Sequence, residues 1–151
     1  MREAWVSPTY DNNTPTSEEI KEWINLNAFA ARLLQLDTIS WAVYALWELR
    51  DALEQPCDGD ILECNVVAAA QWIKYSGRAL YTSATNEDEG NDNFSAVNGP
   101  LYEGSPVLCL ERWRFWKRRF GELGDQAQAN AKQIAWKART EMEAIEQGHI
   151  S

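Results

Sequence analysis

Residues 39–53, ISWAVYALWELRDAL, form the most regular pattern in the chain. Apolar side chains recur there at steps of three and four residues, which is the spacing along one face of an α-helix; they are Ile39, Ala42, Leu46, Leu49 and Leu53. Aromatic side chains flank this stripe, so the helix is apolar over most of its circumference and is expected to lie at the centre of a bundle. Pro56 is expected to end it.

Helical patterns continue on both sides of this stretch. Thr16 and Glu19 have the spacing of a capping box and predict a helix that runs to about Leu36. A turn at residues 58–60 leads into a third helix, and residues 105–124 and 125–148 predict a fourth and a fifth. No segment alternates apolar and polar side chains as a half-buried strand does. We therefore predict an all-α fold of about five helices in a single bundle.

Several glycines and prolines refine the expected helix ends. Ser105 followed by Pro106 is the favoured start of a helix, and Gly121 and Gly124 are expected to close that helix. Gly77 lies inside the third helix, where a glycine costs about 1 kcal/mol relative to alanine. It therefore indicates either a close backbone contact or an early helix end.

The chain has 151 residues, 45% of them apolar, which is the size of one domain with enough material for a core. Residues 1–15 predict an irregular N-terminal arm, and residues 16–148 predict the helical domain. Residues 84–105 are rich in acidic and turn-forming side chains, and we expect a mobile acidic loop there, between helices three and four.

The net charge of −9 is distributed unevenly. Residues 1–104 carry 17 acidic and 6 basic side chains, whereas residues 105–151 carry 6 acidic and 8 basic ones. The simplest interpretation is that the two parts attract each other within one fold. The overall charge argues against nucleic acid and anionic membranes as partners.

Metal and export signals are missing from the sequence. The three cysteines, Cys57, Cys64 and Cys109, match no zinc spacing, and His149 is the single histidine. We therefore predict no metal site and no cofactor. The N-terminus lacks the apolar region of a signal peptide, and no apolar run is long enough to span a membrane. A cytoplasmic or nuclear location is expected.

Four tryptophan-containing blocks follow one another at characteristic distances: WINLNAFAARL at 23–33, ALWELRDALE at 45–54, AAQWI at 69–73 and ERWRFWKRRF at 111–120. Together they resemble a fungal family of helical domains of unknown function (domain of unknown function 3632), over most of residues 17–146. The resemblance implies a fungal, intracellular, helical protein, and it implies no catalytic residues.

One candidate site is a cluster of polar side chains expected between helices. Asn27 lies in the apolar stripe of the first helix, Arg50 has Glu54 four residues on, and Arg32 is close enough to reach the second helix. The simpler interpretation is a set of interhelical hydrogen bonds and ion pairs, with Glu48 and Asp51 on a solvated face. The alternative is the polar floor of a tryptophan-lined ligand cavity. The candidate residues are Trp23, Asn27, Arg32, Trp47, Glu48, Arg50, Asp51 and Trp113.

The second candidate site is a basic, aromatic surface on the fourth helix, formed by Arg112, Arg114, Phe115, Lys117, Arg118 and Arg119. The simplest interpretation is a solvated basic face whose charge is complementary to that of the acidic first part of the chain. Arginine and aromatic side chains are also enriched at the centres of protein interfaces, and interleaved cations and rings suit single-stranded nucleic acid. Of the two binding hypotheses, the protein interface is preferred.

No arrangement of nucleophile, base and histidine is present, so catalysis is not expected. We predict a non-enzymatic protein-interaction module that uses the basic face of the fourth helix, and self-association through exposed aromatic side chains remains open. The alternative is a small-molecule-binding or tailoring protein that uses the tryptophan-lined cavity.

Overall fold

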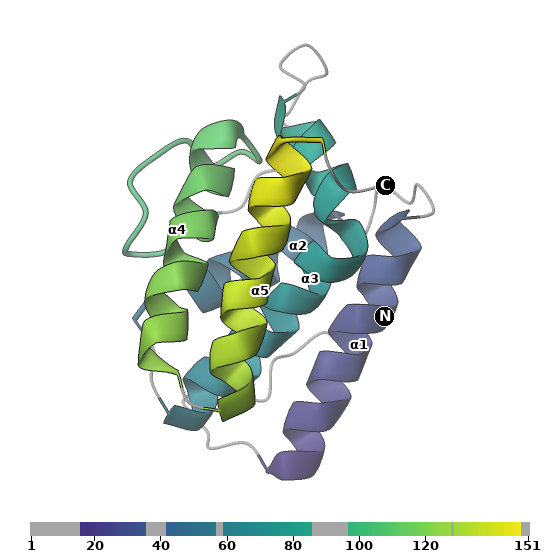
Figure 1. Cartoon of the computed structure of the whole chain (residues 1–151), viewed down its shortest axis with the longest axis vertical. Helices are drawn as coiled ribbons and strands as arrows, with labels where there is room; N and C mark the ends of the chain where they lie inside the picture. The colour runs from purple at the N-terminus through teal and green to yellow at the C-terminus, as the bar shows by residue number, and fades with distance from the viewer. Residues whose placement is uncertain (1–15, 36–41, 57–58, 86–96, 128, 149–151) are drawn as a thin grey trace.

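The computed structural model describes residues 16–35, 42–56, 59–85, 97–127 and 129–148. Five helices make up most of these ranges: α1 (Ser17–Gln35), α2 (Ala42–Leu53), α3 (Gly59–Thr85), α4 (Leu110–Gln126) and α5 (Ala129–Glu146). The helices pack against one another, and the described ranges contain no strand (Figure 1). The predicted all-α bundle is confirmed. The predicted arm at residues 1–15 and residues 86–96 of the predicted mobile acidic loop lie outside the described residues.

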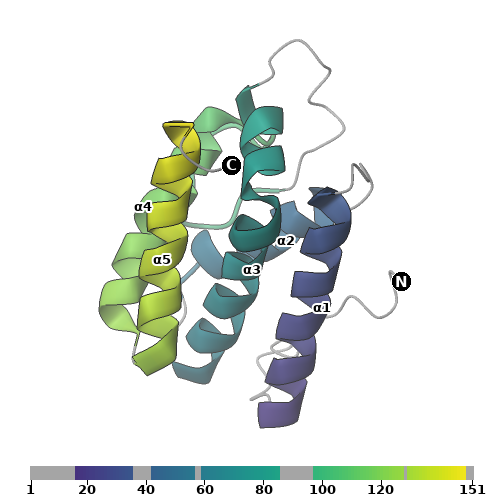
Figure 2. The same cartoon turned by 45° about the vertical axis from the view of Figure 1, so that its right-hand side comes forward.

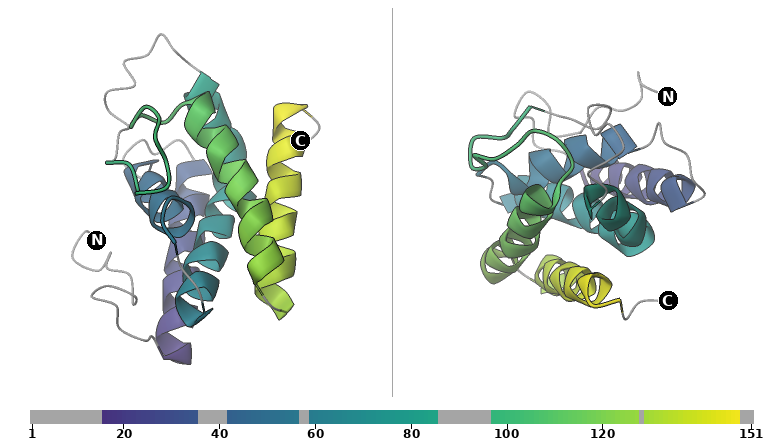
Figure 3. Two further views of the ribbon diagram at one scale, coloured as in Figure 1. Left: turned by 90° about the vertical axis from the view of Figure 1, so that its left-hand side faces the viewer. Right: turned by 90° about the horizontal axis from the view of Figure 1, so that it is seen from above.

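Helix α3 is the centre of the bundle. It packs against each of the other four helices, with α2 on one side of it and α5 on the other (Figure 3). Helices α1, α3 and α5 run in the same direction and α4 runs in the opposite one, as the colours show in Figures 1 and 2. The expectation that residues 39–53 form the central helix is therefore wrong. The longer α3 can reach all its neighbours, whereas the short α2 packs chiefly against α3 and α4.

The start of α1 follows the sequence pattern. The backbone N–H of Thr16 donates to Glu19 Oε1 at 3.1 Å, and the backbone N–H of Glu19 donates to Thr16 Oγ1 at 3.1 Å. This reciprocal pair satisfies two backbone donors that a helix leaves unpaired at its N-terminus. The capping box is confirmed.

The first turn of α4 lies further along the chain than the sequence predicts. The helix begins at Leu110 rather than at Pro106, and Cys109 occupies the N-cap position without a side-chain hydrogen bond. Residues 97–109 instead form a non-helical segment before the helix, which is called the pre-α4 segment below. Its contacts with α2, described in the next subsection, explain why it does not join the helix.

Glycines allow the α4–α5 pair to pack closely. Gly121 and Gly124 lie inside α4 and do not end it, which corrects the prediction. A Cβ at Gly121 would lie 2.8 Å from Nη1 of Arg139, and a Cβ at Gly124 would overlap the ring of Trp136. Gly77 likewise lies inside α3 and faces Ile145 of α5, so the predicted close contact is confirmed.

The core is continuous through the bundle and rich in large side chains. Trp72 of α3 and Trp113, Trp116 and Phe120 of α4 are fully buried. Each buried aromatic side chain removes roughly 150–250 Å² of its surface from water, so these rings contribute heavily to stability.

Candidate functional site

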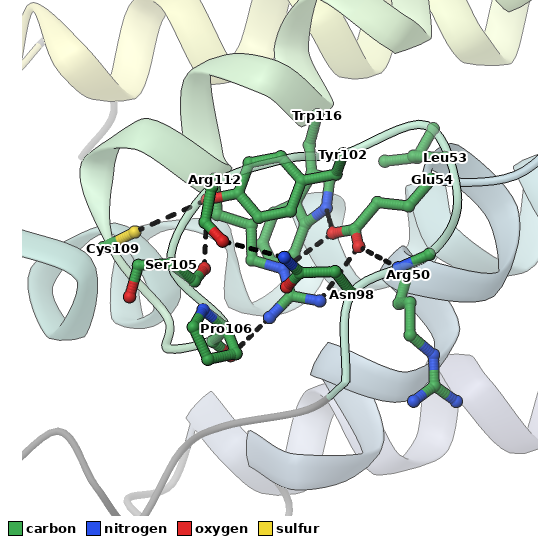
Figure 4. Close-up of polar contacts among 12 residues, drawn as sticks. Arg50, Leu53, Glu54, Asn98, Tyr102, Ser105, Pro106, Cys109, Arg112 and Trp116 are labelled. Carbon is green, nitrogen blue, oxygen red and sulfur yellow. Dashed lines mark hydrogen bonds and ion pairs between the residues drawn. The ribbon is translucent and has the colours of Figure 1, made fainter.

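A buried ion pair joins the end of α2 to the start of α4. The guanidinium of Arg112 donates from Nε to Glu54 Oε2 at 2.6 Å and from Nη2 to Glu54 Oε1 at 2.9 Å, and both side chains are 0% exposed (Figure 4). Trp116 Nε1 donates to the same carboxylate at 2.7 Å, and Nη1 of Arg112 donates to the carbonyl of Pro106 at 2.5 Å. Two buried charges thus have the bidentate geometry and extra hydrogen bonds that such a pair needs.

Glu54 also fixes the pre-α4 segment. The backbone N–H of Gly99 donates to Glu54 Oε1 at 2.9 Å, and that of Leu101 donates to the Glu54 carbonyl at 2.8 Å. The backbone at Gly99 comes so close to Glu54 that a Cβ there would lie 2.5 Å from its carbonyl oxygen. This position therefore requires a residue without a side chain, and the segment is held against the end of α2.

Tyr102 fixes the other end of the pre-α4 segment to α4. Its hydroxyl shares one proton between the Ser105 carbonyl at 3.0 Å and Glu111 Oε1 at 3.2 Å, and the backbone N–H of Ser105 donates to the same carboxylate oxygen at 3.1 Å. Burial, the neighbouring Cys109 and the Glu111 carboxylate all raise the pKa of the Tyr102 phenol, which therefore stays protonated as a donor.

A groove of about 590 Å³ opens between this segment and α4. One wall is formed by Leu101, Tyr102, Glu103 and Gly104, and the other by Glu111, Arg114, Phe115 and Arg118. The rings of Tyr102 and Phe115 lie 5.2 Å apart, centre to centre. The groove therefore combines an aromatic contact with two arginines on one helix.

The structure separates the basic residues predicted on α4 into two groups. Arg114 and Arg118 are exposed, and the described ranges offer neither of them an ion pair. The guanidinium of Arg118 lies 5.2 Å from the centre of the half-buried Phe115 ring. These three side chains face the groove.

The other three basic residues of the predicted surface are used inside the fold. Arg112 is buried, which corrects its placement on an exposed face. Lys117 pairs with Glu146 of α5 at 2.6 Å, and Arg119 Nε donates to the Leu53 carbonyl at 2.9 Å. These cations connect α4 with α5 and α2.

The predicted cluster between helices is only partly assembled. Asn27 is fully buried, donates to the Trp23 carbonyl at 2.9 Å and accepts from Trp72 Nε1 at 2.7 Å. Its amide thus joins α1 to α3, as the simpler interpretation predicted. Trp113 packs against Tyr81, with the ring centres 5.1 Å apart. Tyr81 lies nine residues beyond Trp72 on α3, so Trp113 contacts a different part of that helix from the part that Asn27 contacts.

The charged members of that cluster have other partners than those expected. Arg32 is exposed and lies over the ring of Tyr75, 4.8 Å from its centre, rather than reaching α2. Arg50 pairs with Asp51 at 3.0 Å and not with Glu54, because Glu54 is bound by Arg112. Trp47 is half-buried against the core, with its ring 5.4 Å from that of Tyr44.

Glu48 is buried, so its expected place on a solvated face is wrong. Burial raises the pKa of its carboxyl well above the ordinary value, the neighbouring Asp51 raises it further, and the nearby Trp23 indole and the charge of Arg50 lower it. Burial, and then the Glu48 charge, also raise the pKa of the Cys64 thiol to about 12. A thiol with that pKa stays protonated at neutral pH and is a poor nucleophile.

Sequence patterns missed one wall of the groove and its buried support. Leu101, Tyr102, Glu103 and Gly104 lie in what the composition identified only as a loop, and no periodic pattern marks such a wall. The sequence does indicate that Arg112 is buried. It precedes Trp116 and Phe120 at steps of four residues, so it lies on the apolar stripe of the helix.

Among the described residues, no group of three or more His, Cys, Asp or Glu side chains could hold a metal ion. No helix within these ranges is long and apolar enough to cross a membrane.

No curated protein matches this chain, and no solved structure does. Residues 1–120 match the family described as "Protein of unknown function (DUF3632)", in agreement with the resemblance of the tryptophan-containing blocks. Since the match covers more than half of the sequence, the chain belongs to the DUF3632 family.

Proposed function

We propose that this protein is a non-enzymatic protein-interaction module and that the groove beside α4 is its docking surface. The observation that carries the proposal is the position of Arg114 and Arg118 on either side of Phe115, on one wall of the groove, with no ion pair from the described residues. Arginine and aromatic side chains in a concave site are the usual anchors of protein interfaces.

The surrounding contacts support the proposal. The pre-α4 segment is fixed at Glu54 and again at Glu111, so the groove has two defined walls before any partner arrives. A preformed surface binds with a smaller loss of conformational entropy than one that must be ordered. The neighbouring cations of α4 are already engaged, which leaves Arg114 and Arg118 for a partner.

The test is capture of partners by the tagged 151-residue chain in extracts of its host. The double variant Arg114→Glu with Arg118→Glu should lose a partner that the wild-type chain retains. The matched control is Lys21→Glu with Arg78→Glu, which changes the net charge equally at two exposed positions on α1 and α3. The proposal fails if no protein is retained, or if the control variant loses it to the same extent.

A further inference from the structure

We infer that the groove beside α4 recognises an acidic peptide segment that carries an apolar side chain between its carboxylates. This inference deepens the proposed function and rests on it, since it names the chemistry of the partner.

The apolar seat is formed by Leu101, Tyr102 and Phe115. Leu101 is 42% exposed at the edge of the groove, and the half-buried ring of Phe115 packs beside that of the buried Tyr102. An apolar side chain of a partner that covers Leu101 and Phe115 removes apolar surface of both proteins from water, which favours association.

The charged wall is formed by Arg114 and Arg118. Residues four apart lie on the same side of a helix, so both guanidinium groups lie along one edge of the groove. The guanidinium of Arg118 lies over the Phe115 ring, and a guanidinium in that position still has N–H groups to donate. These fit the two oxygens of a carboxylate.

The opposite wall carries the other sign of charge and therefore sets the orientation of the partner. Glu103 on this wall is exposed and has no ion pair among the described residues. Glu111 lies on the α4 wall beside the arginines, and its carboxylate is already hydrogen-bonded to the pre-α4 segment through Ser105 and Tyr102. Glu103 repels a second anion, so the partner's carboxylates must lie against α4.

The same arrangement favours a peptide over a nucleic acid. A nucleic acid carries a charge at every phosphate, and it would meet Glu103 across the groove and a chain whose net charge is −9. A peptide needs only a few carboxylates, placed on one side, and supplies the apolar side chain as well.

The experiment is a fluorescence-anisotropy titration of the 151-residue chain with short dye-labelled peptides. The probe has glutamates on both sides of a central leucine–phenylalanine pair. One comparison peptide replaces that pair by two serines, and another replaces the glutamates by lysines. A labelled single-stranded DNA oligonucleotide is titrated in parallel.

We expect the acidic apolar probe to bind most tightly. Its affinity should fall about tenfold or more in Arg114→Glu with Arg118→Glu, because two attractive charges become repulsive. It should also fall about tenfold for the serine peptide, because the apolar contact is lost. Affinity should rise in Glu103→Lys and decrease with added salt, which screens exposed charges.

Three results would overturn the inference. These are equal binding to wild type and the double arginine variant, equal binding of the serine peptide and the probe, or tighter binding of the lysine peptide or the oligonucleotide. If the extract experiment yields a partner that depends on Arg114 and Arg118 while the probe does not bind, the partner chemistry is wrong and the proposed function stands. If neither binds, both fail.

Discussion

Two of the arginines of α4, Arg112 and Arg114, are only two residues apart and have opposite surroundings. Arg112 is 0% exposed and bonded to the Glu54 carboxylate through two of its nitrogens. Arg114 is exposed on the groove, without a carboxylate partner among the described residues. The local sequence around them is one continuous basic and aromatic run, so composition does not distinguish the two side chains.

Position around the helix distinguishes them. Arg112, Trp116 and Phe120 follow one another at steps of four residues and face α2 and the core, and Arg114 and Arg118 follow on another side. A charge on the core-facing side is tolerated only with a matched partner, whereas a charge on the solvent side remains available for binding. The same residue type is thus paired inside the fold at one position and exposed to solvent at the other.

The largest expected effect comes from breaking the buried pair. Glu54→Gln replaces the carboxylate by a neutral amide and leaves Arg112 charged and buried. We expect the free energy of unfolding to fall by about 3–5 kcal/mol, measured by urea denaturation. Glu103→Gln removes a carboxylate from an exposed site and should change it by no more than about 0.5 kcal/mol. Equal losses in the two variants would contradict the comparison.

A second change separates the charge of the pair from its packing. The double variant Glu54→Leu with Arg112→Met removes both charges together and leaves neither one unpaired. It should be more stable than either single variant, because removing both partners avoids the penalty of an uncompensated buried charge. Denaturation of all three variants in one series measures this coupling. Additive losses would show that the two side chains act independently.

The hydrogen bond between Asn27 of α1 and Trp72 of α3 joins two neutral side chains. Its loss should lower the free energy of unfolding by less than the loss of the buried ion pair. Asn27→Leu removes the acceptor of the Trp72 indole N–H, and the loss of a buried hydrogen-bond partner costs about 1–3 kcal/mol. Asn25→Leu is the matched control, because Asn25 is exposed on the same helix. If Asn27→Leu unfolds at the same denaturant concentration as wild type, the amide of Asn27 does not stabilise the contact between α1 and α3.

Glu48 contributes a dependence of stability on pH. Because the pKa of Glu48 is raised in the folded chain, chiefly by burial, its stabilising contribution is fully present below the ordinary value of 4.5. That contribution is lost as the pH rises from there through the raised pKa. Glu48→Gln keeps a neutral side chain at every pH, so its stability relative to wild type should increase above about pH 4.5.

Thermal denaturation at several pH values measures this difference. The pKa of Asp51 is raised as well, chiefly by burial, but Asp51 is present in both proteins and largely cancels from the comparison. Glu63→Gln, at an exposed position on α3, is the control. If the stability difference between Glu48→Gln and wild type stays constant as the pH rises above 4.5, the carboxylate of Glu48 is not buried in its charged form.

The smallest expected effect on stability is at the groove. Arg114→Glu with Arg118→Glu should change the free energy of unfolding by no more than about 0.5 kcal/mol, as exposed substitutions usually do. Urea denaturation alongside the binding titration measures it. A large loss of stability would mean that these arginines support the fold, and the groove would then have no independent role.

The sequence predicts the helices well because their apolar side chains repeat regularly and because local signals such as the Thr16–Glu19 capping box act within a few residues. It does not predict which helix is central, since that depends on the length of each helix and on which other helices it contacts in the folded chain. It also places the start of α4 too early, because Ser105 and Pro106 are held in another conformation by contacts with Tyr102, Glu111 and Arg112.

The sequence also predicts one wall of the groove, the one formed by α4. Arg114, Phe115 and Arg118 belong to the predicted basic face, and the structure brings them together on the groove. The wall that faces them depends on Gly99 and Leu101 binding Glu54, 45 residues from Gly99 in the chain. Such a long-range contact leaves no periodic mark in either segment.

The most direct test of the contrast within α4 is one pair of substitutions, Arg112→Gln and Arg114→Gln, compared by urea denaturation. They are identical in chemistry and two residues apart. We predict that Arg112→Gln lowers the free energy of unfolding by about 3–5 kcal/mol, because Glu54 is left buried and unpaired, and that Arg114→Gln changes it by at most about 0.5 kcal/mol. Equal losses, or a larger loss for Arg114→Gln, would contradict the division of α4 into a side that supports the fold and a solvent-exposed side.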